Sequence, residues 1–506
     1  MSQKTYHEHK LLVDLLSKAH INHQQMFSHL DFRGKKTKMT KLFEMIRYHN
    51  FKGIDELKTK FCTQERQGNQ AFRKMWHGFK EKLSNTLFFV DTNSPIFSER
   101  TKAYYMSAKR AMASRMLNER GAQNMAIELA ENTLSISLKY EFNDINMMLV
   151  NFLMQRYSSR SNYKKIKYYL TLFNKLQPIY SKELEMSYES AKLSSSINIK
   201  STSKVRIHTK NLESVTKKCI EYLEDAPSIE LIATCSLIII QYYTSIGDFD
   251  KCKYWSKFTL DLILGKPFLS VLLLERNIDN ILRTTLLDKD YERALEVEKL
   301  YSDKLIPGNY NWLVIYYYFI LTMLHSKQYQ IAYDRWEKIM NASYLKNQSQ
   351  VIAEVYHILH AYFYFLRQTR WIEVRQNFPE LRIHKFLNEV PEFSKDKRGS
   401  NISIIIAQIL FLLISDKHGK IIDKMDSLKL YSFRHLRKDE NFRSQCFIQM
   451  LQEMIKADFK KKGTMFRSDK WLNKLNQVNI EKYPQSAENE VIPYEDLWEM
   501  ILEQLD

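Results

Sequence analysis

The sequence contains few of the residues that form turns. Only 11 of its 506 residues are glycine and 9 are proline, about 2% each against usual frequencies near 7% and 5%. Because tight hairpin turns depend on such residues, the chain cannot contain many β-hairpins. We therefore expect helices joined by short polar connections, with few strands or none.

Cysteine is also scarce, and the cysteines are scattered. Their number is odd and no CxxC pair occurs among them: Cys62, Cys219, Cys235, Cys252 and Cys446. This pattern argues against a disulfide framework or a zinc ribbon and indicates a reducing compartment. The first residues, MSQKTYHEHK, lack the apolar core of a secretory signal. We expect a cytoplasmic protein.

Long apolar runs are missing as well. The longest uncharged ones span residues 312–324 and 402–415, and both are shorter than the roughly 18 to 20 residues that cross a membrane. Buried helices of a soluble protein explain these runs better. No membrane partner is expected.

Enzyme and metal signatures are absent too. The sequence has no GxxxxGK[ST], GxGxxG, HExxH or GxSxG motif. His20 and His23 share a helical face, but no carboxylate or cysteine stands at ligand spacing beside them. We expect no enzyme, no cofactor and no metal. A site assembled from residues distant in sequence remains open, since catalytic partners need not be neighbours in the chain.

What the sequence does contain is a repeated pattern, seen clearly in SIGDFDKCKYWSKF at residues 245–258. An aromatic residue follows a short turn, and small or apolar residues follow it at helical spacing. The pattern starts at Tyr163, Phe249, Tyr291, Tyr329 and Trp371, and in weaker form at Gly121, Leu212 and Ile421. An apolar helix of about four turns precedes each clear copy, so each copy predicts a helical hairpin. A non-repetitive helical bundle with coincidental aromatic residues is the alternative.

These stretches resemble the tetratricopeptide repeat (TPR) family. The resemblance is carried by residues 245–260, by LLDKDYERALEVEKLY at 286–301 and by HSKQYQIAYDRWEKIM at 325–340. It covers about residues 103–430, but the copies are longer and less regular than the 34 residues of the family. The first-helix tryptophan and glycine of the family are mostly missing. The resemblance implies an all-α, right-handed, TPR-like solenoid that binds proteins or peptides on its concave face.

Three parts are predicted from changes in composition. Residues 1–102 are expected to form a basic helical bundle, residues 103–390 the solenoid, and residues 391–506 a degenerate repeat with a C-terminal helical cap. The serine-rich segment 194–210 is interpreted as a long connection or a frayed repeat. Polar residues 391–401 mark the second boundary.

Charge divides the chain unevenly. Residues 1–120 hold 23 Lys and Arg against 11 Asp and Glu, whereas residues 481–506 hold one Lys against eight acidic residues. A basic run lies between two predicted helices and consists of Arg33, Lys35, Lys36, Lys38 and Lys41. Such a run could bind the phosphates of DNA or RNA. A nucleic-acid-associated regulator with a peptide-sensing solenoid is therefore the alternative function, although no recognition motif accompanies the charge.

The preferred function is a non-enzymatic scaffold or adaptor for a protein or peptide. The repeat alignment places the candidate groove on the first helices of the hairpins, at Arg276, Asn280, Arg283, Tyr317 and Tyr318, flanked by Gln241 and His360. Arginine and asparagine could hold a carboxylate or a peptide backbone, and tyrosine offers rigid apolar contact. These side chains could equally do no more than keep the groove solvated.

The acidic end, PYEDLWEMILEQLD at residues 493–506, places its apolar residues on one helical face. We expect it to cap the exposed end of the solenoid, because a repeat array needs a terminal cap. A detachable helix that docks on the basic N-terminal part or on a partner is the alternative.

Overall fold

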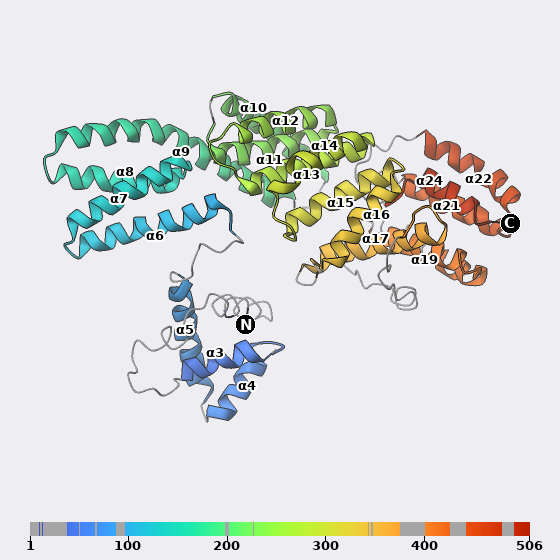
Figure 1. Ribbon diagram of the computed structural model, residues 1–506, viewed down its shortest axis with the longest axis horizontal. Helices are drawn as coiled ribbons and strands as arrows, with labels where there is room; N and C mark the ends of the chain where they lie inside the picture. The colour runs from blue at the N-terminus through green and yellow to red at the C-terminus, as the bar shows by residue number, and fades with distance from the viewer. Residues whose placement is uncertain are drawn as a thin grey trace. The chain divides into compact units, whose positions relative to one another are not determined.

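The computed structural model describes residues 38–49, 51–65, 68–87, 97–197, 202–225, 227–342, 344–345, 348–374, 400–425, 442–477 and 490–505, with Lys10 and Val13. These residues form helices and connections, and none of them lies in a strand. The predicted all-helical class is confirmed, and so is packing between consecutive helices (Figure 1). The right-handed twist of the solenoid stays a prediction.

The helices of the first part are α3 (Lys38–Tyr48), α4 (Ile54–Glu65), α5 (Asn69–Thr86), α6 (Glu99–Glu119), α7 (Gln123–Lys139), α8 (Asn143–Ser158) and α9 (Tyr163–Ile197). They are followed by α10 (Thr202–Glu224), α11 (Ile229–Ile246), α12 (Phe249–Leu264), α13 (Val271–Asp288), α14 (Tyr291–Tyr301), the 3₁₀ turn η2 (Ser302–Lys304), α15 (Tyr310–His325), α16 (Tyr329–Asn341) and α17 (Gln350–Gln368). The remaining named helices are α19 (Ser400–Leu413), α21 (Phe442–Lys456), α22 (Lys461–Asn476) and α24 (Tyr494–Leu502). The chain divides into two compact units, Met1–Tyr180 and Ser181–Asp506, with the division inside α9. The predicted boundaries at residues 102 and 390 stay predictions.

The described helices of unit 1 form two apolar cores. In the first, aromatic side chains of α4 and α5 pack together, with Trp76 stacked between Phe72 and Phe79 at ring distances of 6.1 and 5.6 Å. The second core joins α6, α7 and α8. Small buried residues face each other there, including Ala103, Ser107 and Ala111 on α6 and Ala126, Ala130 and Thr133 on α7. Small side chains at this spacing let two helices approach closely.

A carboxylate ties the last helices of unit 1 together. Glu131 on α7 accepts hydrogen bonds from the hydroxyls of Tyr157 and Tyr169, at 2.9 and 2.7 Å, and from Nζ of Lys165 at 2.8 Å. Burial raises the pKa of Glu131, but these three donors outweigh it and leave the pKa below its usual value. The ionised carboxylate therefore fixes α8 and α9 against α7.

One kind of corner connects the helices. A residue with positive φ ends the first helix, and the amide of the next residue donates to a carbonyl five residues earlier. At Gly247 (φ 73°), Asp248 donates to Tyr243 at 2.9 Å, and at Lys289 (φ 55°), Asp290 donates to Thr285 at 2.9 Å. This is the Schellman arrangement, which satisfies carbonyls left open at a helix end. Among the described residues it also occurs at Gly121, Glu141, Ser161, Lys327, Arg370, Asp416 and Asp458.

The corners coincide with the pattern found in the sequence. Helices α9, α12, α14 and α16 begin at the predicted anchors Tyr163, Phe249, Tyr291 and Tyr329. Asp248 and Asp290 close one helix and cap the next, because their carboxylates accept the amides of the residues three positions later, at 3.1 and 3.0 Å. The prediction of helical repeats is confirmed in this form.

Two details of the prediction are wrong. Leu212 follows no corner, because it lies in the middle of α10. Most of the segment 194–210 is helical, because α9 runs to Ile197 and α10 begins at Thr202. The interpretation as a long connection is therefore wrong, whereas the alternative of a frayed repeat stays a prediction. Serine and threonine favour turns only weakly, and the flanking helices override that preference. The predicted break at 391–401 lies largely outside the described residues.

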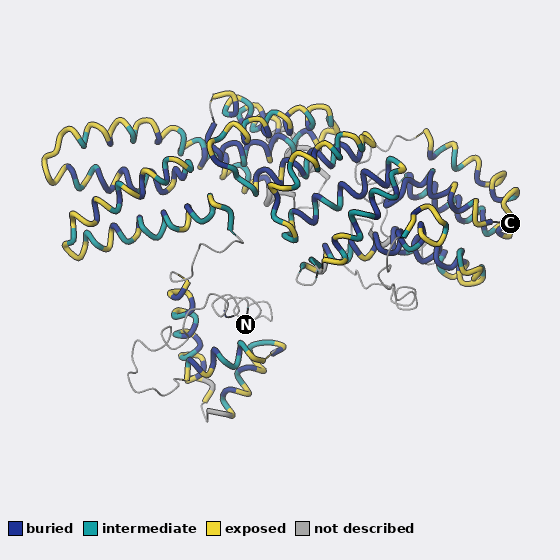
Figure 2. Tube along the Cα trace, viewed as in Figure 1, coloured by how far each residue is buried: buried dark blue, intermediate teal, exposed yellow. Residues whose placement is uncertain are grey.

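Among the described residues of unit 2, a continuous apolar core joins α12 to the C-terminal helices. It extends from Leu260 on α12 to Leu505 and includes the fully buried Trp336, Tyr356 and Trp498. Buried residues follow the facing sides of neighbouring helices, while the outer sides are exposed (Figure 2). Helix α11 is long and apolar enough to cross a membrane by length and composition. It packs between α10 and α12, so we describe it as a core helix.

The acidic end of the chain packs closely on unit 2. The backbone oxygen of Glu490 lies 2.6 Å from Nε2 of His325, and Asp496 pairs with Nζ of Lys327 at 2.9 Å. The ring of Tyr494 stacks on Phe447 of α21 with centroids 4.4 Å apart. Residues 490–505, called the C-terminal segment below, thus join the α15–α16 corner to α21. Its role as an end cap stays a prediction.

Candidate binding cleft

The predicted groove residues do not all reach the surface. Helices α13 and α15 pack side by side, which brings Arg283 over the ring of Tyr318 at 4.1 Å. Arg276 is exposed, and Asn280, Arg283, Tyr317 and Gln241 are half-buried. Tyr318 and His360 are only 4% exposed, so these two assignments are wrong.

The burial of these two side chains follows from helix geometry. Tyr317 and Tyr318 are consecutive, and consecutive residues point about 100° apart on a helix. Tyr318 therefore turns inward toward α13, with Arg283 covering its ring. His360 turns toward α16, where its ring lies 4.9 Å from that of Trp336. Neither side chain can contact a partner.

A cleft of about 630 Å³ opens elsewhere, between α14, α15 and α16. Its residues are Leu295, Glu298, Lys299, Ser302, Trp312, Tyr316, Arg335, Lys338 and Ile339. This volume is in the range of sites that enclose a small ligand or several side chains of a peptide. We call it the aromatic cleft.

Two aromatic rings of α15 form one wall of the aromatic cleft. Tyr316 is half-buried and provides most of the accessible surface, whereas Trp312 lines the cleft but is only 8% exposed. Trp312 and Tyr316 are four residues apart, so they share one face of the helix, and their ring centroids are 4.5 Å apart. Tyr344 packs against Trp312 at 5.2 Å. Burial, and next the charge of Glu298, raise the pKa of Tyr316 to about 12. Its hydroxyl therefore stays protonated at neutral pH and can donate a hydrogen bond.

An ion pair links the two second helices across the cleft. Nε and Nη2 of Arg335 on α16 donate to the two carboxylate oxygens of Glu298 on α14, at 2.6 and 3.0 Å. This bidentate geometry is rigid, and both side chains are largely covered. The pair holds adjacent hairpins at a fixed separation and neutralises the one carboxylate of the cleft.

The remaining charges of the cleft are positive. Lys299 and Lys338 are exposed and form no ion pair with a described residue. With Arg335 they give three cations against the single carboxylate of Glu298. The cleft therefore combines an aromatic wall with two available ammonium groups.

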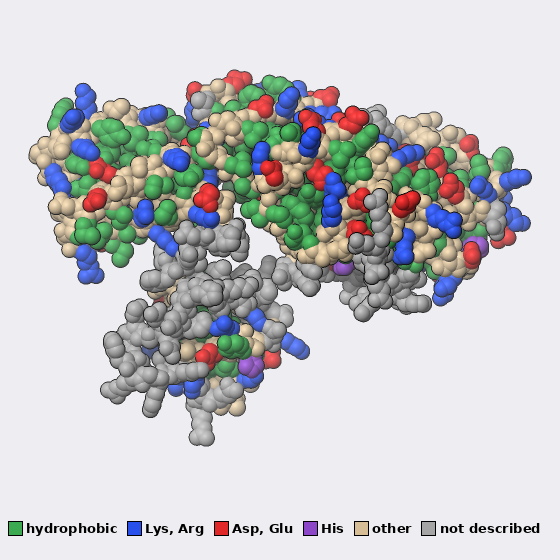
Figure 3. All heavy atoms as spheres, viewed as in Figure 1, with side chains coloured by type: hydrophobic (Ala, Val, Ile, Leu, Met, Phe, Trp, Pro, Cys, Tyr) green, Lys and Arg blue, Asp and Glu red, His purple; other side chains and the backbone are tan. Residues whose placement is uncertain are grey.

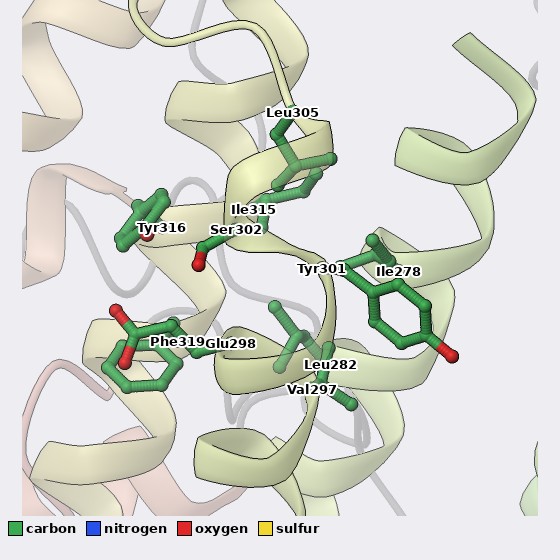
Figure 4. A pocket seen from close by; sticks show the side chains of 10 residues that line it. All are labelled: Ile278, Leu282, Val297, Glu298, Tyr301, Ser302, Leu305, Ile315, Tyr316 and Phe319. Carbon is green, nitrogen blue, oxygen red and sulfur yellow. The ribbon is translucent and has the colours of Figure 1, made fainter. Parts of the chain in front are cut away.

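A small internal cavity lies beneath the aromatic cleft and shares Glu298, Ser302 and Tyr316 with it (Figure 4). Its volume is about 10 Å³, about enough for one water molecule. In Figure 4, Glu298 and Tyr316 lie on one side of the cavity and Tyr301 on the other. The floor of the cleft is thus apolar and nearly filled, so a partner would bind from the open side.

Most of the basic residues predicted to bind nucleic acid lie outside the described part of the chain. Arg33, Lys35 and Lys36 lie outside the described residues, while Lys38 and Lys41 are exposed on α3. Within the part of the chain that the structure describes, no group of three His, Cys, Asp or Glu could hold a metal ion.

Comparison with known proteins gave no match. No family model matches the chain, and neither a curated protein nor a solved structure matches it. The resemblance to TPR proteins therefore stays a prediction, carried by the residues of the corners.

The aromatic cleft was not predicted from the sequence. The prediction placed binding on the first helices of the hairpins, whereas the cleft draws most of its charge from the second helices, α14 and α16. A signal was present: Glu298 and Arg335 stand 37 residues apart at similar positions of consecutive repeats. Oppositely charged residues at repeat spacing could have indicated a contact between hairpins.

Proposed function

We propose that the chain is a non-catalytic binding protein whose aromatic cleft takes an extended peptide segment of a partner. The segment carries an aromatic or large apolar side chain with carboxylates beside it. The observation that carries this proposal is the pairing of the Trp312–Tyr316 wall with the available lysines Lys299 and Lys338.

The chemistry of each group supports this partner. Trp and Tyr are the side chains that most often anchor an interface, because they bury a large rigid surface at little entropic cost. Lys299 and Lys338 would attract carboxylates and speed association. The hydroxyl of Tyr316 stays neutral and donates to Glu298, so its oxygen could accept a hydrogen bond from a peptide amide.

Peptide titration tests the proposal. Fluorescent nine-residue peptides with one central Trp and zero to four Glu would be titrated by anisotropy against the full chain and its K299E/K338E variant. We expect affinity to rise with each Glu, and the double charge reversal to weaken the most acidic peptide about tenfold or more, as for partly exposed charge pairs.

The control is K257E/K420E, which reverses two exposed lysines outside the cleft. The control should bind like the unchanged chain, so that a loss specific to the cleft is separated from a change in net charge. Equal affinity for all the peptides, or equal loss in both variants, would reject the proposal.

A further inference from the structure

The outer face of α22 exposes an aromatic side chain. Phe466 is 85% exposed and its neighbour Met465 is 50% exposed. The opposite face of the helix is buried, through Thr464, Ser468 and Leu475. A phenylalanine at this position gains almost no stabilisation from burial, and among the described residues no other large hydrophobic side chain is as exposed.

Cations surround this phenylalanine. Lys462 and Lys470 lie four residues before and after Phe466, one helical turn away on the same face. The full set is Lys460, Lys461, Lys462, Arg467, Lys470 and Lys474, against the single acid Asp469. We call these residues with Met465 and Phe466 the α22 patch. Lys and Arg side chains gather at the edge of the structure where α22 lies (Figure 3).

Lys470 and Lys474 lie over the ring of Trp471 at 5.8 and 4.6 Å, but the three cations at the start of the helix do little for it. Lys460, Lys461 and Lys462 stand at its first residues, and the cap Lys460 makes no side-chain hydrogen bond to the helix. Positive charge at a helix N-terminus is unfavourable, because the helix dipole is positive there. None of these three lysines pairs with an acidic side chain within the described residues. These three positive charges are unfavourable at the helix N-terminus and form no ion pair that would stabilise the fold, so they indicate an anionic partner.

We propose that the α22 patch binds the surface of a membrane that contains anionic phospholipids. A lipid surface is flat and accepts a protruding ring at the depth of the headgroups, where aromatic side chains are favoured. Lysines beside the ring reach the phosphates with their long stems. A basic cluster on a helix is the pattern that anionic membranes attract.

Composition favours this surface over other anionic partners. Five of the six cations are lysine, and lysine is depleted in protein interfaces, where arginine is preferred. Sites for single-stranded nucleic acid combine a basic groove with stacking rings, whereas Phe466 projects from the crest of a single helix. The inner face of α22 already packs against α21, so contact is shallow, reversible and mainly electrostatic.

Vesicle sedimentation tests this proposal independently of the aromatic cleft. The full chain would be mixed with phosphatidylcholine vesicles, with or without phosphatidylserine at about a third of the lipid. We expect binding only to the anionic vesicles, weakening steeply with salt. The K461E/K462E/K470E variant should bind about a hundredfold more weakly, since each lysine near such a surface contributes roughly fivefold.

A matched control reverses as many exposed lysines elsewhere. K164E/K167E/K175E changes three lysines of α9 that are exposed and unpaired within the described residues, and should bind almost like the unchanged chain. F466S should weaken binding without removing the need for anionic lipid. Circular dichroism of each variant separates lost binding from lost folding.

Four outcomes would overturn the proposal. One is equal sedimentation with both kinds of vesicle, and another is an equal effect of the α9 and α22 reversals. The third is failure to bind vesicles while labelled single or double strands bind and depend on the α22 lysines, which would assign the patch to nucleic acid. Inorganic phosphate as a competitor tests whether a free anion suffices: displacement at low millimolar concentration would favour a free phosphate ligand over a lipid surface.

Discussion

Arg443 and Glu490 form a bidentate ion pair in the interior of unit 2, with Nε–Oε1 and Nη2–Oε2 distances of 2.8 Å each. Both side chains are almost completely buried. Nη2 of Arg443 also donates to Glu495 at 2.7 Å, and Nη1 to the carbonyl of Leu475 at 3.3 Å. One guanidinium thus fixes the C-terminal segment to α21 and α22.

Removing one partner of this pair should be costly. In R443M the carboxylate of Glu490 would stay buried without its cation, and such losses destabilise a protein by about 3 to 5 kcal/mol. The R443M/E490L double variant should recover much of this, because the completely buried carboxylate of Glu490 is gone as well and only the partly exposed Glu495 lacks its cation. Urea unfolding of both variants measures the difference. A double variant that is no more stable than R443M would show that the charges themselves stabilise the fold.

The buried imidazole of His325 should make stability depend on pH. Burial lowers its pKa from 6.5 to about 4, and the neutral ring donates from Nε2 to the carbonyl of Glu490. The unfolded chain therefore binds the proton more tightly than the folded chain. The stabilisation is complete above pH 6.5 and is lost as the pH falls toward 4. The loss is about 3 kcal/mol in total, at about 1.4 kcal/mol per pH unit.

Comparison with H325Q isolates this effect. A glutamine amide can donate to the same carbonyl but does not titrate, so H325Q should lose less stability than the unchanged chain between pH 6.5 and 4.5. Urea unfolding at several pH values gives the free energy of unfolding of each protein. The carboxylates elsewhere titrate alike in both proteins, so their contribution cancels in the difference. If the free energies of unfolding of H325Q and of the unchanged chain fell in parallel with pH, the assignment of a neutral, buried His325 would be contradicted.

The corners offer a pair of opposite substitutions. Gly247 has φ 73° with open space around the position of a Cβ atom, so G247A should cost about 1 kcal/mol through backbone strain alone. Lys289 holds φ 55° with a side chain, so K289G should be neutral or stabilise by up to about 1 kcal/mol. Thermal unfolding measures both. Destabilisation by K289G would mean that the lysine side chain contributes more than the strain it causes.

Thiol reactivity should separate the cysteines into two classes. Cys62 is half-buried, whereas Cys219, Cys235, Cys252 and Cys446 are buried. Burial raises the pKa of Cys252 and of Cys446, which suppresses the reactive thiolate. In the folded protein, Ellman's reagent should therefore modify one thiol quickly and four slowly, and the fast phase should vanish in C62S. A fast phase that persists in C62S would contradict this burial pattern.

The sequence predicts the corners of the repeats better than it predicts the binding surface. Asp248 and Asp290, each followed by an aromatic residue, are local signals, because a helix cap needs only neighbours in the chain. Which of Tyr317 and Tyr318 is exposed depends on how α15 is rotated against α13. The local sequence pattern does not distinguish two adjacent tyrosines. The aromatic cleft depends on three helices at once, and the separation of α14 from α16 is fixed by the Glu298–Arg335 pair. Such contacts between distant residues carry no signature in a single sequence beyond their spacing.

The spacing of the corners in unit 2 shows how such an array can change length. Among the described residues, the corners at 247, 289, 327, 370, 416 and 458 are 42, 38, 43, 46 and 42 residues apart, so three intervals are 42 or 43 residues long and the other two are shorter or longer by about four. Four residues advance a helix by slightly more than one turn of 3.6 residues and return its next side chains to nearly the same rotational phase. An insertion of two residues would rotate the side chains that follow it by about 200° and present the wrong face of the helix to the neighbouring hairpin. The array can thus grow or shrink by whole turns, and a corner would tolerate a four-residue insertion in the helix before it far better than a two-residue one.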